Sequence, residues 1–501
     1  MFKDEHRYEV WNEIRQHGIR AFSEQLTPEV LADAAVRTGV KLVKSPLCLA
    51  SLVWLGISAA LHASLDFATV LGQTLRLLED QQNFYRTKLG KERQKAKRRK
   101  AGKSKHSPHR SDPTQVSEEA FAKARQRMPL EFWLNLIIVL GERFEAAHGA
   151  MVRFRGFRLL AVDGTEIDLP NWKPLKDYFG TAKNKSGQHN AQGRMVMLQL
   201  PLVRLPYRYV LSPQSVGEIT LARRLSKHLR QNDLVLMDAG YWSYGLLWEI
   251  QNRQAFFAIR LKSGIPLRLV RRLGPGDQLM RWKPKDSRGQ WKKEGLPKSI
   301  DVRVITYQVP GFRAQKLVTN VLSPHRIPRA DWIRLTTECS VKGRLKPGLY
   351  HRRWEIETTF RELKVEQGME WSLRSRTPES IQFEVAGHVV LYLLVRWLIV
   401  EAAVRHKLDP LSLSFSHALD ELISMHDSLV TASRSWAEEL LHRLLERIAA
   451  HIVPWRPGRH YPRKKKSTNH KRKPQRAKAT MSRSTKANGK TKQQFAKSRK
   501  P

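Results

Sequence analysis

The spacing of apolar residues separates helical segments of the chain from sheet-forming ones. Residues 8–85 follow a helical period, and Pro28 after Thr27 is typical of a capped first turn. The same period returns over residues 116–147, where Ser117 is a candidate cap. After these helices the apolar runs become short, as they are in strands. We therefore predict helices first and a sheet after them.

Strand and helix patterns alternate in the following segment, which ends near residue 262. Three strand patterns come first: FRLLAVD, GRMVMLQLPLVR and RYVLSP. A helix, a buried strand, a second helix and a further strand follow: LARRLSKHLRQ, LVLMD, YGLLWEIQNR and AFFAIRLK. This alternation is typical of an α/β sheet that combines a meander with crossover helices. We predict an α/β fold whose central sheet lies in this segment.

Segments of other character surround the predicted sheet. Residues 263–344 lack helical spacing and contain the strand patterns SIDVRVITYQV and KLVTNVL, so we predict a β-rich insertion there. Helical spacing returns over residues 345–455. Two basic stretches have no apolar period: an arm at residues 86–112 and a tail at residues 456–501, which lacks Asp and Glu. The tail cannot bury enough surface to fold alone and is predicted to be disordered.

The charge of the chain indicates its kind of partner. The 501 residues include 90 Lys and Arg against 46 Asp and Glu, which gives a formal net charge of +44. A protein this basic attracts polyanions, of which nucleic acid is the commonest, while an anionic membrane is the rival partner. The two cysteines, Cys48 and Cys339, cannot build a disulfide framework and suit a reducing cytoplasm.

Two apolar stretches are candidates for membrane spans. Residues 47–61 are shorter than the ~20 residues of a spanning helix. Residues 385–404 are longer but contain His388, Arg396 and Glu401. The charged N-terminal segment has no apolar core of a signal peptide. We interpret both stretches as buried helices, and expect a cytoplasmic protein without a membrane anchor.

One helix pattern carries a group of polar residues on a single face. In LYHRRWEIETTFRELK, four residues fall within an arc of about 60° at ~100° per residue: Tyr350, Arg353, Glu357 and Lys364. The other acids, among them Glu362, lie on the opposite side. A carboxylate is a hard oxygen ligand for Mg²⁺, and Arg and Lys beside it can hold DNA phosphates. A single Glu of this kind could equally form an ion pair on a solvated helix surface.

Two aspartates stand at the ends of apolar strand patterns upstream. Asp163 in LLAVDGTEIDLP precedes a Gly-Thr turn, and Asp238 in DLVLMDAGYWS precedes Ala-Gly-Tyr. An aspartate at a strand end often only caps a turn. Glu166 and Asp168 compete with Asp163, which we prefer because the buried run ends there.

These residues resemble a known family. Tyr, two residues, Arg, three residues, Glu, six residues and Lys form the signature of the insertion-sequence-four family of DDE transposases, and residues 350–364 match it without a gap. Asp163 and Asp238 resemble the first and second aspartate motifs of that family. The segments SEEAFAKARQRMP and LRSRTPESIQFEVAGHVVLYLLVRWLI are similar to the helices that flank its catalytic domain.

The resemblance implies a domain plan. The fold class is α/β, with an RNase H-like catalytic core, a β-rich insertion, and helical N- and C-terminal regions. The implied regions are a helical DNA-end-binding region at 1–150, the catalytic core at 155–262 and 345–405, the insertion at 263–344, C-terminal helices at 406–455 and the basic tail at 456–501.

The resemblance also implies the site, the cofactor and the partners. The catalytic and metal-binding residues would be Asp163, Asp238 and Glu357. The residues that contact DNA phosphates would be Tyr350, Arg353 and Lys364. Two Mg²⁺ ions ~4 Å apart, with Mn²⁺ as a substitute, would serve cleavage of the element ends and joining of their 3′-hydroxyls. The partners would be double-stranded DNA of the transposon ends and of the target, held by a homodimer in the synaptic complex.

Some questions stay open at this level. Relatives with hairpin chemistry use an insertion-domain Trp to hold a flipped base. The stretch AQKLVTNVL has no Trp, and Trp282, Trp291 and Trp332 are alternatives that could equally be packing residues. The same three acids would suit an RNase H-like nuclease or resolvase that cuts without joining. The charge alone would suit a non-catalytic nucleic-acid-binding protein.

Overall fold

The computed structural model describes most of the chain between residues 20 and 453. The described ranges are 20–22, 24–40, 49–63, 70, 118–126, 128–181, 190–284, 294–308, 314–333, 348–431 and 434–453. The predicted basic arm at 86–112, the predicted tail at 456–501 and the candidate cap Ser117 lie outside these ranges.

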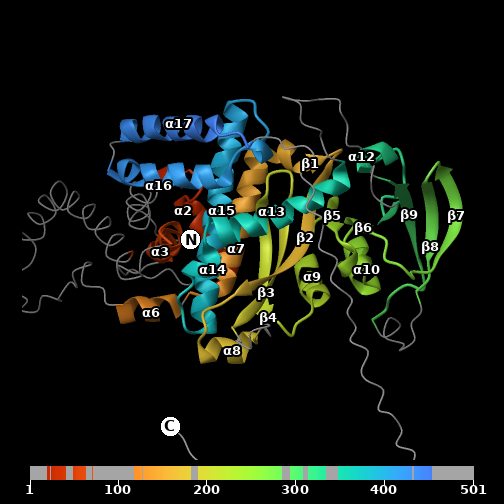
Figure 1. Cartoon of the computed structure of the whole chain (residues 1–501), viewed down its shortest axis with the longest axis horizontal. Coiled ribbons are helices and arrows are strands. Elements are labelled where there is room, and N and C mark those ends of the chain that lie inside the picture. Colours follow the sequence, from red (N-terminus) through yellow and green to blue (C-terminus); the bar gives the residue numbers. More distant parts are fainter. Residues whose placement is uncertain are drawn as a thin grey trace, which may run out of the picture. The chain divides into compact units, whose positions relative to one another are not determined.

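A ten-stranded mixed sheet forms the centre of the fold (Figure 1). Its strands follow the order β4-β3-β2-β5-β6-β10-β9-β8-β7, and β1 pairs with β2 beside this path. The strands are β1 (Arg153–Phe154), β2 (Phe157–Asp168), β3 (Gln192–Leu200), β4 (Leu205–Pro213), β5 (Asp233–Met237), β6 (Phe256–Arg260), β7 (Leu267–Gly274), β8 (Asp277–Trp282), β9 (Ile300–Tyr307) and β10 (Gln315–Thr319).

The first five strands of the path have the topology of an RNase H-like core. Strands β2, β3 and β4 form an antiparallel meander. Strands β5 and β6 then run parallel to β2. Helix α9 (Glu218–Ser226) connects β4 to β5, and helix α10 (Tyr244–Asn252) connects β5 to β6. Parallel neighbours require such crossover connections. The α/β fold class predicted from the strand and helix patterns is confirmed.

The segment between residues 263 and 344 continues the same sheet. Strand β10 pairs antiparallel with β6 and with β9, and β8 and β7 extend the sheet further. The hairpin of β7 and β8 is absent from the strands that the sequence predicts. Six of the eight residues of β7 are exposed and the other two are only partly buried, so its sequence has no alternation of buried and polar positions.

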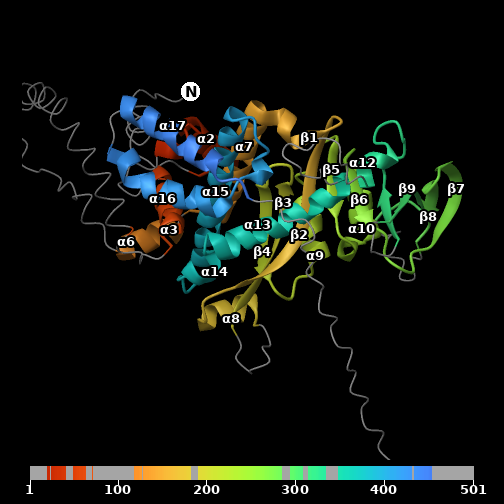
Figure 2. The same cartoon turned by 45° about the horizontal axis from the view of Figure 1, so that its top comes forward.

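Helices cover the meander end of this sheet and form a bundle beside it, as Figures 1 and 2 show. Helices α7 and α15 pack on each other and on β4, while α9 packs on β3 and β4. Helices α2 and α3 pack on α7 and α15 respectively. The helices not yet bounded are η1 (Arg20–Phe22), α2 (Pro28–Thr38), α3 (Leu49–Leu61), α6 (Glu118–Gln126), α7 (Leu130–His148), η3 (Gly149–Val152), α8 (Lys173–Phe179), η4 (Ala239–Tyr241), α12 (Arg329–Ile333), η5 (Leu349–Trp354), α13 (Glu355–Arg361), η6 (Glu362–Glu366), α14 (Met369–Ser372), α15 (Pro378–Arg405), η7 (Pro410–Ser412), α16 (Phe415–Thr431) and α17 (Arg434–Ala450).

The first described α-helix begins where the sequence predicts, but the predicted cap residue makes a different contact. Helix α2 starts at Pro28, whose fixed φ suits the first turn. The side chain of Thr27 makes no capping hydrogen bond and accepts one from Arg143 of α7 at 2.9 Å instead. The residue therefore links two helices rather than capping one.

Helix α15 is the longest of the described helices, and most of its residues are buried. It begins at Pro378, and the hydroxyl of Thr377 accepts a hydrogen bond from the backbone N–H of Ser380. The helix is long and apolar enough to cross a membrane, but its most apolar stretch is wholly buried inside the protein. Its apolar surface is therefore covered by other parts of the fold, as the sequence analysis predicts for residues 385–404.

Candidate active site

Asp163 and Asp238 lie level with each other on neighbouring strands. Strands β2 and β5 pair in parallel, and the last pair of their register joins Ala161 to Leu236. Asp163 and Asp238 each follow that pair by two residues, on strands that lie ~4.8 Å apart. Strand β5 ends at Met237, whereas β2 continues beside β3. The two carboxylates therefore meet where one parallel strand stops and its neighbour continues.

Each aspartate also makes a local hydrogen bond. Oδ1 of Asp163 accepts from the backbone N–H of Gly164 at 2.9 Å. Oδ1 of Asp238 accepts from Gly240 at 2.7 Å and so caps the short helix η4. The turn-capping role that competes with a catalytic one in the sequence is thus present for one oxygen of Asp238, while no described hydrogen bond occupies Oδ2.

The third acid comes from a helix of three different geometries, which we call the signature helix (residues 349–366). It starts as the 3₁₀ turn η5, continues as the α-helix α13 and ends in the π-helical segment η6. The uniform α-helix expected from the sequence is therefore wrong, because the rotation per residue changes along it. Glu357 lies in the α-helical part and is 43% exposed, so its carboxylate is open to solvent.

Arg353 joins the signature helix to the sheet. Its Nη1 donates to Oδ2 of Asp163 at 3.0 Å, and its Nη2 donates to Oε1 of Glu357 at 3.2 Å. The guanidinium is 7% exposed and lies over the ring of Trp354, 4.4 Å from its centroid. A buried cation therefore bridges two of the three predicted acids, and brings the helix-borne one to the strand-borne one.

Tyr350 and Lys364 are both turned towards the sheet. The buried hydroxyl of Tyr350 donates to the carbonyl of Met237 at 2.9 Å, directly before Asp238. Nζ of Lys364 donates to the carbonyl of Glu166 at 2.6 Å and pairs with Glu370 at 2.9 Å. These contacts with the protein differ from the phosphate contacts that the sequence predicts for both residues.

Comparison with known proteins relates the chain to a family. A family model described as a transposase DDE domain matches residues 155–394. Over 359 residues the chain is 28% identical to transposase InsG for insertion sequence element IS4 of Escherichia coli strain K12, which covers 70% of this chain and 76% of that protein. The chain is similar to DDE transposases of the insertion-sequence-four family over 70% of its length. The resemblance inferred from residues 350–364 is thereby confirmed, and so is the predicted transposase function.

The family acts on DNA and uses divalent metal ions. A solved structure of the piggyBac transposase, in a synaptic complex with hairpin DNA, matches this transposase at 10% sequence identity and a TM-score of 0.30. The match covers 60% of this chain and 58% of that one, a little over half of its length.

The electrostatics of the transposase single out Asp163. Burial raises its pKa to about 6, while the N–H of Gly164 and the guanidinium of Arg353 oppose the rise. The negative charges of Asp238 and Glu357 raise it further. These charges act on Asp163 because each of the two carboxylates lies near it. A buried acid with like-charged neighbours favours a cation beside it.

The three carboxylates are of the ligand type that divalent cations prefer, but in this structure they are not close enough together to hold one. Within the described ranges, no group of three Asp, Glu, His or Cys side chains is close enough to hold a metal ion. The positively charged guanidinium of Arg353, rather than a metal ion, lies between Asp163 and Glu357. Carboxylate oxygens are the ligands that Mg²⁺ and Mn²⁺ prefer. The three side chains are therefore of the chemical type that binds a divalent ion.

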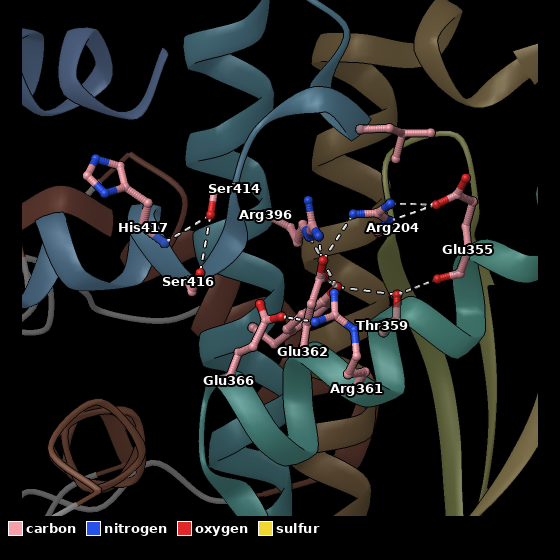
Figure 3. Close-up of polar contacts among 12 residues, drawn as sticks. Arg204, Glu355, Thr359, Arg361, Glu362, Glu366, Arg396, Ser414, Ser416 and His417 are labelled. Atoms are coloured by element: carbon pink, nitrogen blue, oxygen red, sulfur yellow. Dashed lines mark hydrogen bonds and ion pairs between the residues drawn. The ribbon is translucent and has the colours of Figure 1, made fainter. Parts of the chain in front are cut away.

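A buried charge network anchors the far side of the signature helix (Figure 3). Glu362 is 2% exposed and pairs with Arg396 of α15, and with Arg204 at 3.0 Å. The hydroxyl of Tyr392 donates to the same carboxylate at 2.6 Å. Although burial acts to raise it, the two guanidiniums lower the pKa of Glu362. The sequence puts this acid opposite the polar face, but only the isolated Arg396 in an apolar helix signals a buried partner.

Two of the tryptophans considered for base binding are packing residues. Trp282 is 3% exposed and packs against Trp242 and Tyr244. Trp332 is 1% exposed. Trp291 lies outside the described residues. A side chain buried in this way cannot stack on a flipped base without leaving the core.

Proposed function

We propose that this transposase binds the terminal inverted repeats of its element, cuts the DNA at the element ends and joins the 3′-hydroxyls to target DNA. Its catalytic and metal-binding residues are Asp163, Asp238 and Glu357. The observation that carries this assignment is the bridge by Arg353, which brings Glu357 of α13 to Asp163 at the point where β5 ends.

Two Mg²⁺ ions, for which Mn²⁺ can substitute, serve as the cofactor in this proposal. When bound, such ions activate a water or a 3′-hydroxyl and stabilise the leaving oxygen. Asp163 and Asp238 hold them from the sheet, and Glu357 holds them from the helix. The raised pKa of Asp163 supports this role, because the guanidinium of Arg353 does not fully offset burial and the neighbouring acids, and a bound cation adds positive charge there.

The basic residues of the signature helix exchange protein partners for DNA phosphates. Arg353 leaves one of its two carboxylates, and the nitrogen that is freed donates to a phosphate oxygen instead. Lys364 is 21% exposed and can turn from Glu370 to the backbone of the DNA. The hydroxyl of Tyr350 is committed to the carbonyl of Met237, so we assign it to fixing the end of β5 in addition to any phosphate contact.

The assembly follows from the reaction. Both ends of an element must be held at once, so we propose a homodimer in the synaptic complex. Residues 1–150 bind the element ends, and residues 155–262 with 345–405 form the catalytic core, interrupted by the insertion at 263–344. We expect the protein to act in the bacterial cytoplasm, where its DNA lies.

Strand cleavage with isosteric variants tests the assignment. The substrate is a duplex of the DNA that flanks the open reading frame, incubated with full-length protein and Mg²⁺. Asp163→Asn, Asp238→Asn and Glu357→Gln should each reduce cleavage by at least ~100-fold, since each removes a metal ligand. Asp168→Asn is the matched control: its carboxylate lies on the same strand but accepts from Gln192, and cleavage should stay near the wild-type rate.

The outcomes of this assay test both the three metal ligands and the type of reaction. Near wild-type cleavage by any of the three variants removes that residue from the site. Loss of cleavage in the Asp168→Asn control would show that charge on β2, rather than metal binding, limits the reaction. Products that are cut but never joined to a second duplex would identify a nuclease in place of a transposase.

A further inference from the structure

A fourth carboxylate lies beside the proposed metal site. Glu218 is the first residue of α9, the crossover helix between β4 and β5. Gly164 directly follows Asp163, and a Cβ atom on it would be 2.9 Å from Cδ and 3.1 Å from Oε1 of Glu218. The side chain of Glu218 therefore lies against the backbone of β2, in the space that a larger residue at position 164 would fill.

Glu218 approaches β2 from the face opposite to Glu357. Successive side chains of a strand point to opposite faces of the sheet. The carboxylate of Asp163 bonds to Arg353 of the signature helix, so the next residue, Gly164, faces the other side, where Glu218 lies. Together, Glu218 and the signature helix place acids on both faces of the sheet at the position of Asp163.

A buried hydroxyl accompanies this group of acids. Tyr241, three residues after Asp238, is 1% exposed, and its hydroxyl lies close to the carboxylate of Glu218 without a well-formed hydrogen bond to it. Burial raises the pKa of this phenol, and the nearby charges of Asp163, Glu218 and Asp238 raise it further. A buried hydroxyl without a partner costs ~1–3 kcal/mol. It therefore needs a partner within the acidic group, such as a carboxylate oxygen or an ordered water.

We infer that Glu218 is a fourth carboxylate of the divalent-cation site of Asp163 and Asp238, and that the hydroxyl of Tyr241 orients it. The inference rests on the proposed function, because it needs the two aspartates to hold the cation. Glu218 is partly exposed and binds the cation directly or through one of its waters. Tyr241 donates to Glu218 or to that water, which gives its hydroxyl a well-formed hydrogen bond.

Stabilisation of the helix dipole is a simpler role for Glu218, but it explains fewer of these observations. An acid in the first turn of a helix stabilises the helix dipole, and Glu218 is in that position in α9. The dipole does not explain why position 164 has no side chain where Glu218 lies, or why the hydroxyl of Tyr241 is buried next to three acids.

Cation binding by the full-length protein tests the inference without depending on activity. Mn²⁺ is titrated into DNA-free protein, and free Mn²⁺ is measured by electron paramagnetic resonance. Relative to wild type, Glu218→Gln should weaken binding roughly 10-fold and Tyr241→Phe by less, as expected for ligands and for the groups that orient them. Glu249→Gln is the matched control, since it removes one charge and loosens α9 through Arg223, 2.8 Å away, but lies outside the acidic group.

These variants distinguish a failure of the Glu218 inference from a failure of the proposed metal site. If Asp163→Asn and Asp238→Asn lose Mn²⁺ while Glu218→Gln binds like Glu249→Gln, the inference is overturned and the proposed function stands. If the aspartate variants also bind like wild type, the proposed metal site itself fails. Glu218→Asp distinguishes a ligand from a dipole effect, because it keeps the charge at the helix start but shortens the reach. Wild-type affinity in that variant together with a loss in Glu218→Gln would leave only the dipole.

Discussion

Removing the charge of Glu362 should destabilise this transposase more than any other single isosteric change in its signature helix. The carboxylate is 2% exposed and is shared by Arg396, which is completely buried, and by Arg204. In Glu362→Gln, Arg204 keeps Glu355 at 2.8 Å. Arg396 keeps only the hydroxyl of Tyr392 at 3.1 Å. One further nitrogen of Arg396 already lacks a hydrogen bond, so almost the whole cost of an unpaired buried cation remains.

The size of the effect follows from this asymmetry. Leaving one charge of a buried pair without its partner costs about 3–5 kcal/mol. Arg396→Met should cost less, ~1–3 kcal/mol, because Glu362 then retains Arg204 at 3.0 Å and Tyr392 at 2.6 Å. The double variant should be more stable than the sum of the two single changes predicts, by about 2 kcal/mol, because neither charge is left alone.

Urea unfolding followed by circular dichroism measures these free energies. Arg361→Gln is the matched control in the same helix: its guanidinium is 60% exposed and pairs with Glu366, so its loss should cost less than ~1 kcal/mol. An unfolding free energy for Glu362→Gln equal to that of Arg361→Gln would refute the reasoning. So would simple additivity in the double variant, because it would mean that Glu362 and Arg396 do not interact.

Three further results are expected. In metal-free buffer, Asp163→Asn should exceed wild type in unfolding free energy above pH 6 by up to about 3 kcal/mol, and the gain should vanish near pH 4. The sign follows because burial raises the pKa of Asp163 from 3.8 to about 6, so its ionisation over this interval destabilises the folded protein; a gain independent of pH would contradict this cause. Gly164→Ala should displace Glu218, whose Cδ is 2.9 Å from the new Cβ, and so weaken Mn²⁺ binding, whereas unchanged binding would place Glu218 outside the site. Lys364→Met should weaken binding to any DNA sequence and reduce the slope of log affinity against log salt by ~1, and an unchanged slope would show that Lys364 touches no phosphate.

The core strands can be predicted from the sequence because their side chains are buried on both faces, or because an aspartate follows the apolar run. Strand β5 is buried along its whole length, so LVLMD is recognisable without any knowledge of its neighbours. Strand β7 is different, since it is almost fully exposed and forms only because β8 supplies its backbone partners. A pattern of buried positions cannot reveal a strand that buries almost nothing.

The same limit applies to the site. The spacing of Tyr350, Arg353 and Glu357 predicts a shared face, because such neighbours are local in sequence. It cannot predict that Arg353 bonds Asp163, which is 190 residues away, or that the helix changes geometry along its length. Glu218 escapes notice for the same reason, since only the packing of α9 on the sheet brings it to Gly164.

The signature helix is held by opposite charges on its two sides, and this explains how it can present Glu357 accurately. Towards the sheet, Arg353 is a cation between two acids, while towards α15, Glu362 is an acid between two cations. The second arrangement is closed to solvent and has no reason to change when DNA or metal binds. The first is next to an exposed carboxylate and can exchange its partners. The helix is therefore fixed at the core, while under the proposed function a divalent cation replaces Arg353 on its sheet side, so that one element is both rigid and reactive.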